Sequence, residues 1–274
     1  MLHFYLISCV QIVLESFPVS SSGHCFLLQK IFSDFFSSNL SDVYSVCSVT
    51  AETFFNNKLV THFLHGPTVF VLAFFFFRRW SFLLIHFRSC WKVIVKLIFL
   101  MGLSGSATAV LYIVVKVFHL SSFPLWIGFF LSACALFSLR FIKEEKRAAF
   151  SWSRALILGL VQGVALLPGI SRMGVVFVAA RWLGLSKKKS FEVTFLIFWP
   201  LTAAAFLNSV TIRAWYADLC VWHVLFSVRT LSVFFVASVV AFFSLWFVWF
   251  LVQKKKMWIF SLYLLLPTIL CFFL

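Results

Sequence analysis

Long apolar stretches recur along the whole chain, and they limit its fold more than any other feature. An apolar helix of roughly 20 residues crosses the hydrocarbon core of a bilayer, with its backbone polar groups satisfied inside the helix. Six stretches fit this pattern and predict transmembrane helices: 59–77, 97–115, 121–139, 190–212, 230–252 and 257–274.

The composition indicates the same environment. Of the 274 residues, 63% are hydrophobic and only 11% are charged, and the mean hydropathy is +1.05. A soluble domain is about half apolar and about a quarter charged, so in water this chain would have too little polar surface to cover itself. The seven cysteines form no Cys-x-x-Cys pair, which argues against a disulfide framework or a zinc site. The sequence therefore predicts a single integral membrane domain over residues 1–274.

Two further apolar stretches, 1–28 and 155–180, are each interrupted near the middle by a polar turn. The first turn is Pro-Val-Ser-Ser-Ser-Gly-His at 18–24, and the second is Pro-Gly-Ile-Ser-Arg-Met-Gly at 168–174. Proline breaks a helix and glycine allows close backbone approach. Both stretches are therefore expected to be broken helices.

Clusters of basic residues predict how these pieces thread the membrane. The net charge of +15 is compatible with nucleic-acid binding, but the basic residues lie between apolar stretches, as the positive-inside rule describes. We therefore expect membrane lipids and no nucleic acid as partners. Seventeen of the 23 basic residues fall in four segments that should all be cytoplasmic: 78–96, 140–154, 181–189 and 253–256.

Only the stretch 155–180 separates the second basic cluster from the third, so it should return to the side from which it entered. If 78–96 is cytoplasmic, the span 59–77 starts on the opposite side, and so does the loop 25–58 that precedes it. The stretch 1–28 should therefore enter the membrane from that opposite side and return to it. The expected fold is an all-α polytopic membrane protein with six transmembrane helices and two re-entrant helical hairpins. Its halves, approximately 1–139 and 155–274, form an inverted-topology repeat, which places a binding site near the midplane.

The repeat has weak support in the residues themselves. Pro18 and Ser21 share a Pro-x-x-Ser spacing with Pro168 and Ser171. A glutamine also lies upstream of each turn, at positions 11 and 162.

Glu15 is the one acidic residue within an apolar run, where an ionisable group is costly and suggests function. Gln11 precedes it by four residues, so both lie on one helix face. The alternative is a pair that only holds helices together.

Next along the chain, Ser20, Ser21 and Ser22 are followed by Gly23 and His24. Hydroxyls and exposed amides favour anion binding, and an imidazole suits acid–base or nucleophilic chemistry; the alternative is an ordinary polar turn.

The second turn offers Gly169, Ser171 and Arg172. An arginine in lipid needs a partner, and its planar fork suits a phosphate. A structural ion pair between Arg172 and Glu15 is the alternative. If the hairpins meet, carboxylate, cation, hydroxyls and imidazole form a constellation typical of phosphoryl transfer.

The two motifs around these turns resemble those of a known protein family. Gln11-x-x-x-Glu15-Ser-Phe-Pro-Val-Ser-Ser-Ser-Gly-His24 resembles the first conserved element of the undecaprenyl-diphosphatase, or bacitracin-resistance, family. The segment 159–174, Gly-Leu-Val-Gln-Gly-Val-Ala-Leu-Leu-Pro-Gly-Ile-Ser-Arg-Met-Gly, resembles its second element. The resemblance implies hydrolysis of undecaprenyl diphosphate to undecaprenyl phosphate and phosphate, in the bacterial inner (cytoplasmic) membrane. This reaction recycles the lipid carrier of peptidoglycan synthesis and underlies bacitracin resistance.

Carried over by position, the resemblance implies a role for each site residue. Glu15, Ser21, His24 and Arg172 would be catalytic, with either Ser21 or His24 as nucleophile. Gln11 and Glu15 would hold a divalent cation, Mg²⁺ or Ca²⁺. The polyprenyl diphosphate would bind at these residues: Ser20, Ser22, Gly23, Gly169 and Ser171. A homodimer is a further possibility.

Three departures from the family pattern qualify this interpretation. Gln11 replaces an acidic residue and Met173 replaces a serine, while His65-Gly-Pro-Thr68 only partly matches a Gly-Thr element, so His62 and His65 cannot be aligned. The main alternative function is a polyprenyl-phosphate transporter or flippase that uses the same midplane site, because inverted repeats are common in transporters. A structural scaffold would leave Glu15 and Arg172 unexplained.

Overall fold

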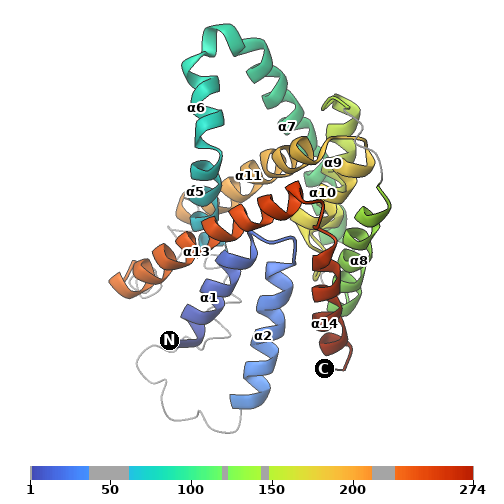
Figure 1. Ribbon diagram of the computed structural model, residues 1–274. Helices are drawn as coiled ribbons and strands as arrows, with labels where there is room; N and C mark the ends of the chain where they lie inside the picture. Colours follow the sequence, from blue (N-terminus) through green and yellow to red (C-terminus); the bar gives the residue numbers. More distant parts are fainter. Residues whose placement is uncertain (1, 37–61, 119–122, 143–147, 212–225, 274) are drawn as a thin grey trace.

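The computed structural model describes residues 2–36, 62–118, 123–142, 148–211 and 226–273, and in these ranges the regular structure is entirely helical. Figure 1 shows the arrangement of the helices. In chain order they are α1 (Leu2–Leu14), α2 (Ser21–Phe36), α5 (His65–Phe75), α6 (Phe77–Ile85), α7 (Phe87–Val117), α8 (Leu125–Ser138), α9 (Trp152–Val164), α10 (Arg172–Trp182), α11 (Lys187–Thr211), α13 (Val228–Gln253) and α14 (Ile259–Phe273).

Each expected transmembrane stretch coincides with a helix. Three of them, α7, α11 and α13, are long and apolar enough to cross a membrane, and α5 with α6 forms a fourth if the pair counts as one span bent by 65°. The helices α8 and α14 are shorter than the stretches that predicted them. Many large apolar side chains on the long helices face outward, as expected for contact with lipid. The chain is a multi-pass membrane protein.

Both interrupted stretches are broken where the sequence predicted. The polar turn at 15–20 separates α1 from α2, and the turn at 165–171 separates α9 from α10. The second helix of the first pair continues to Phe36, so part of the loop expected at 25–58 is helical. The rest of that loop, 37–58, lies outside the described residues.

The basic segment 78–96, expected to connect two spans, is also helical. It forms α6 and the first turns of α7, which together project from the body as an arm (Figure 1). Arginine and lysine are good helix formers, and the apolar residues between them leave the segment no turn signal. No residue of α6 is buried.

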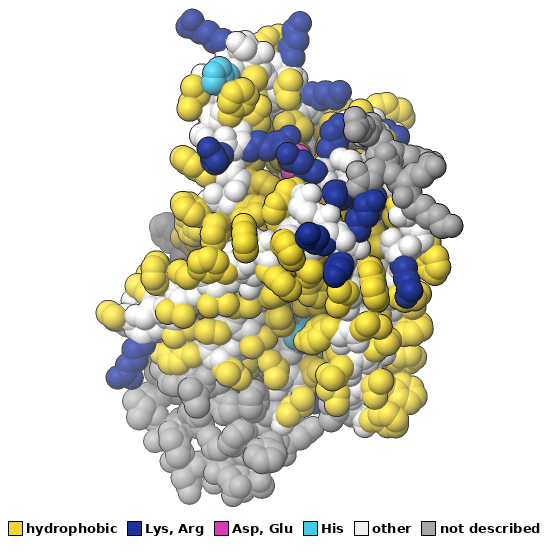
Figure 2. Space-filling view, viewed as in Figure 1, with side chains coloured by type: hydrophobic (Ala, Val, Ile, Leu, Met, Phe, Trp, Pro, Cys, Tyr) yellow, Lys and Arg dark blue, Asp and Glu magenta, His cyan; other side chains and the backbone are white. Residues whose placement is uncertain are grey.

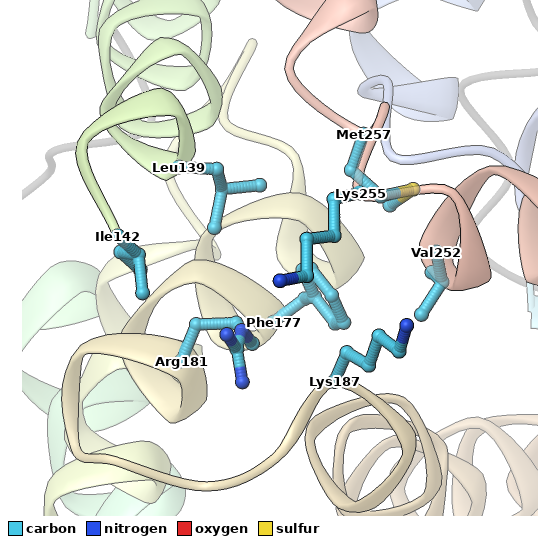
Figure 3. Close-up of a pocket in the computed structure, with 8 residues that line it drawn as sticks. All are labelled: Leu139, Ile142, Phe177, Arg181, Lys187, Val252, Lys255 and Met257. Carbon is cyan, nitrogen blue, oxygen red and sulfur yellow. The ribbon is translucent and has the colours of Figure 1, made fainter. Parts of the chain in front are cut away.

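The described residues of all four basic segments lie at one end of the molecule, as the charge pattern predicted. Arg181, Lys187 and Lys255 point toward one cavity, close to Leu139 and Ile142 (Figure 3). A second cavity brings the arm together with residues 149–150 and with α11. Figure 2 shows most Lys and Arg atoms over this end and a broad band of hydrophobic side chains below it.

Helix packing pairs elements of the two halves. The helix α7 packs on α9, and α13 packs on α1; α8 packs on α14, and α5 on α11. The largest buried apolar cluster joins α1, α5, α10, α11 and α13, with Ile12, Leu72, Phe191 and Leu245 among its fully buried members. This core fixes the broken helices to the long ones.

The turn between α9 and α10 packs directly on α8, and glycines allow the contact. Gly169 has φ +81°, a backbone conformation that favours glycine. A Cβ at Gly128 would lie only 2.0 Å from the carbonyl oxygen of Pro168. The position of this polar turn therefore depends on a backbone-to-backbone contact that no other residue permits.

We expect Gly128→Ala to lower the free energy of unfolding by about 1–3 kcal/mol, because the turn must move away from α8. Thermal unfolding of the purified protein in detergent measures the change. Gly102→Ala is the matched control, because a Cβ there meets no atom within 4 Å. Equal melting temperatures for the two variants would contradict the packing described here.

Candidate functional site

Glu15 lies in the turn that follows α1, buried with only 6% of its surface exposed. Gln11 Nε2 donates a hydrogen bond to Glu15 Oε1 at 3.2 Å, so the predicted pairing on one helix face is confirmed. The side-chain amide oxygen of Gln11, Oε1, accepts from the Cys25 thiol of α2 at 3.0 Å. The two broken halves of this segment are thus joined through Gln11.

Two residues of α5 complete the surroundings of Glu15. His65 Nδ1 lies 2.5 Å from Oε1, and the Thr68 hydroxyl donates to Oε2. In the sequence, His65 and Thr68 were identified only as part of a partly matching Gly-Thr element, and their contact with Glu15 was not predicted. The signal that could have identified them is a histidine within an apolar segment, with a threonine three residues later on the same helix face.

His24 lies in the first turn of α2, and each of its two ring nitrogens lies within hydrogen-bond distance of a partner. Nδ1 lies 2.6 Å from the Ser20 carbonyl oxygen, and because a carbonyl only accepts, the ring proton lies on Nδ1. Nε2 lies 3.0 Å from the hydroxyl of Tyr263 in α14, whose ring stacks on the imidazole. Phe129 of α8 meets the imidazole edge-on, with the ring centroids 5.0 Å apart. Nothing in the sequence predicted Tyr263 at the site.

Serines cap the helices that begin at the two turns. Ser20 Oγ accepts from the Gly23 amide at 3.2 Å, and Ser171 Oγ accepts from the Gly174 amide at 3.1 Å. The matching cap positions are therefore Ser20 and Ser171, whereas the Pro-x-x-Ser spacing pairs Ser21 with Ser171. In the described part of the chain, the hydroxyls of Ser21 and Ser22 make no protein hydrogen bond, and Ser22 is exposed.

The two turns meet. A Cβ at Gly174 would lie 3.1 Å from the carbonyl oxygen of Pro18, so the start of α10 touches the first turn. Figure 1 shows the α1–α2 turn directed toward the centre of the molecule, where α10 lies. Ser132 of α8 holds the second turn by accepting from the Ser171 amide at 2.9 Å. The expected convergence of the two polar turns is thus present in the backbone.

Arg172 is the first residue of α10 and is partly buried. Its guanidinium lies over the ring of Phe198, 5.4 Å from the centroid, and it lines a small cavity with Gln162 and Thr194. Glu15 and Arg172 are close enough for their charges to interact, yet they form no ion pair within 4 Å. The direct ion pair considered from the sequence is therefore not formed.

Met173, which replaces a serine of the family pattern, does not face the turns. Its side chain is 5% exposed and belongs to the large apolar cluster with Ile12 and Phe177. The substitution therefore adds to the core.

Glu192 of α11, an acidic residue close to the basic residues 187–189, pairs with Arg79 of α6 and takes no part in the site. The described cysteines Cys9, Cys25, Cys90, Cys134 and Cys271 are all free thiols.

The polar groups at the two turns offer an incomplete metal site. Within the described residues there is no group of three or more His, Cys, Asp or Glu that could hold a metal ion. Glu15 is the single carboxylate at the two turns, and the side-chain amide oxygen of Gln11 already accepts a hydrogen bond. Mg²⁺ is often bound through one or two carboxylates together with substrate phosphates. The residues present fit a cation of that kind, shared with a phosphate ligand.

The arrangement can bind a phosphate group and move a proton. The first amides of a helix have no partner within it, and the capping serines occupy only those of Gly23 and Gly174. The remaining N-terminal amides of α2 and α10 can donate to an anion, and the helix dipoles favour negative charge at these ends. Arg172 adds a cation, and His24 adds a base.

Comparison with known proteins agrees with this chemistry. The family model described as bacitracin resistance protein BacA matches residues 4–270. Similar curated proteins include the undecaprenyl-diphosphatase of Borrelia hermsii, 28% identical over 290 residues that cover 100% of this chain and 98% of the relative. The undecaprenyl-diphosphatase of Treponema denticola is 27% identical over 266 residues, with coverages of 95% and 92%. Because the family match extends over nearly the whole chain, the protein belongs to the bacitracin resistance protein BacA family.

Proposed function

We propose that this protein hydrolyses undecaprenyl diphosphate to undecaprenyl phosphate and inorganic phosphate. The observation that carries the proposal is the contact of two polar turns, which gathers two helix N-termini, Arg172 and Glu15 inside a membrane protein. A diphosphate on a long polyprenyl chain suits such a site, because its phosphates need cations and amides while its tail needs lipid. The relatives' names state the same activity for those proteins.

We also propose the inverted repeat, with six transmembrane helices, two re-entrant hairpins, and halves at approximately 1–139 and 155–274. The packing pairs support it, since exchange of the halves turns the α7–α9 contact into the α13–α1 contact. The same exchange relates α5–α13 to α11–α7, and α1–α2 to α9–α10.

The register of the repeat gains support from the caps. Gln11 and Gln162 each lie nine residues before the capping serine of their turn, Ser20 and Ser171. With Ser20 matched to Ser171, Ser21 corresponds to Arg172. At this pair of equivalent positions the two halves carry different side chains: the first half has a hydroxyl and the second has a guanidinium.

In the proposed mechanism Arg172 and the free N-terminal amides bind the diphosphate. These groups stabilise negative charge as the anhydride P–O bond breaks and undecaprenyl phosphate leaves. Arg172 is available for this role because its contact is with a ring face and not with a carboxylate. Ser20, Ser22, Gly23, Gly169 and Ser171 shape the two turns around the bound phosphates.

His24 is the proposed proton acceptor. The Ser20 carbonyl fixes the proton on Nδ1, which leaves Nε2 as the basic nitrogen. Once the Tyr263 hydroxyl, which donates to Nε2 in this structure, turns away, Nε2 takes the proton of the group that attacks the terminal phosphorus, either the Ser21 hydroxyl or a water molecule. Attack by Ser21 would form a phosphoserine that water then hydrolyses, whereas attack by water forms no covalent intermediate. His24 itself is held by two neighbours and is less suited to attack.

Glu15 is proposed to orient the site and to contribute to cation binding with Gln11. His65 and Thr68 hold its two oxygens, so the carboxylate is fixed before substrate arrives. A divalent cation, Mg²⁺ or Ca²⁺, would supply charge neutralisation for the diphosphate. Since one carboxylate is a weak ligand set, we expect affinity for the cation to depend on the substrate being present.

A transporter or flippase is less well supported. Transport would require the phosphate-binding groups, but it would not require a base with a fixed tautomer, as in His24. The proposed location is the bacterial inner membrane, with the basic end in the cytoplasm, and dimerisation stays a prediction.

Release of phosphate from undecaprenyl diphosphate by the purified protein, with and without EDTA, tests the proposed function. We expect wild-type activity that falls when EDTA removes the cation. Glu15→Ala, His24→Ala and Arg172→Ala should each lower turnover by at least ~100-fold. The first removes the carboxylate that orients the site and helps to bind the cation, the second removes the base, and the third removes the guanidinium that binds the phosphates. Unchanged melting temperatures show that these variants fold. No release by wild type, with flipping of the lipid in liposomes, would favour the transporter.

Tyr263 is expected to position His24. Tyr263→Phe keeps the ring that stacks on the imidazole and loses one hydrogen bond, which is worth about 1 kcal/mol, so kcat/KM should fall by no more than about 5-fold. Tyr263→Ala also loses the ring that stacks on the imidazole, so its kcat/KM should fall further. Measurement of kcat/KM for both variants checks this, and normal activity of Tyr263→Ala would remove Tyr263 from the site.

A further inference from the structure

A cavity of about 340 Å³ lies between the α6–α7 arm and α11, at the basic end of the molecule. It is separate from the two polar turns, and none of the residues assigned to the reaction lines it. Three cations from three helices surround it: Arg79 of α6, Lys96 of α7 and Lys189 of α11.

The charges around this cavity favour an anion. Glu192 is the single acidic residue among the lining side chains, and it already pairs with Arg79. Lys96 and Lys189 therefore contribute two positive charges that no lining carboxylate balances. Both side chains are exposed, so their amines can reach a ligand that enters from the membrane surface.

The rest of the lining is apolar or aromatic. Leu83, Val93 and Leu97 of the arm line the cavity together with Leu196 of α11. Trp80, also in the lining, packs edge-on against Trp199 with the centroids 5.0 Å apart. Tryptophan is enriched at membrane–water interfaces, where its ring meets acyl chains and its N–H meets headgroups. The cavity thus combines a basic rim with an apolar and aromatic wall.

We propose that this cavity binds an anionic phospholipid of the surrounding membrane. The phosphate lies between Lys96 and Lys189, and the acyl chains follow the apolar wall formed by Leu83, Val93 and Leu97. Basic pockets between transmembrane helices bind the headgroups of anionic lipids in this way. A small soluble phosphate would satisfy the lysines but leave the apolar wall in water. The bound lipid joins the projecting arm to α11, so it stabilises the protein without entering the reaction.

The experiment titrates purified full-length protein in dodecyl maltoside with phosphatidylglycerol, and the melting temperature reports binding. Phosphatidylcholine and glycerol phosphate are the comparison ligands, the second being a headgroup without acyl chains. We expect phosphatidylglycerol to raise the melting temperature saturably and the other two to have little effect. The Lys96→Gln/Lys189→Gln double variant should need about 30-fold more phosphatidylglycerol, or about 5-fold more for each lysine removed.

Lys92→Gln/Lys188→Gln is the matched control, because it removes the same charge from the same two helices at exposed positions outside the cavity. It should retain the wild-type response. Equal responses of the two double variants would overturn the proposal, as would equal stabilisation by phosphatidylcholine. Stabilisation by glycerol phosphate alone would assign the site to a soluble anion and also overturn it. If the double variant does not fold, Lys96→Gln and Lys189→Gln are titrated singly, each with an expected shift of about 5-fold.

Discussion

The contact between the two polar turns is the constraint on which the rest of the molecule depends. Irregular backbone at membrane depth is tolerated only where it is buried in protein or lines a cavity. Here each turn satisfies part of its own backbone through a capping serine, and Ser132 of α8 holds the second turn in place. With Pro18 against Gly174, two helix N-termini are brought together, and their dipoles create a region of positive potential that a phosphate satisfies.

Glu15, the one buried carboxylate among the described residues, illustrates how the site separates its charges. A buried charge is costly unless it is paired and hydrogen-bonded. Glu15 obtains its partners from Gln11 on its own helix and from His65 and Thr68 on α5, so it does not need Arg172. Arg172 instead rests over an aromatic ring, which neutralises nothing and leaves its fork for a phosphate. A direct ion pair between the two would have occupied both groups and favoured a purely structural role.

Local patterns in the sequence predicted the helices, the two breaks, the common end of the basic segments and the Gln11–Glu15 pair. Each of these depends on neighbours in sequence or on charge counted along the chain. Contacts between distant residues were not predictable in this way: Tyr263 reaches His24 across 239 positions, and Thr68 reaches Glu15 across 53. In the proposed repeat, Pro-x-x-Ser spacing matched Ser21 with Ser171, whereas the capping hydrogen bonds match Ser20 with Ser171. Helical continuation of 78–96 went unpredicted because its basic residues were interpreted only as topology signals.

A double-mutant cycle between the two turns tests the central claim that they form one site. Phosphate release from undecaprenyl diphosphate is measured for wild type, Glu15→Gln, Arg172→Gln and the double variant, with melting temperatures to show that all four fold. Residues that act as a unit give strongly non-additive effects on kcat/KM, whereas independent residues give effects that multiply. The account predicts that the double variant is little worse than the poorer single variant. A loss equal to the product of the two single losses would contradict it.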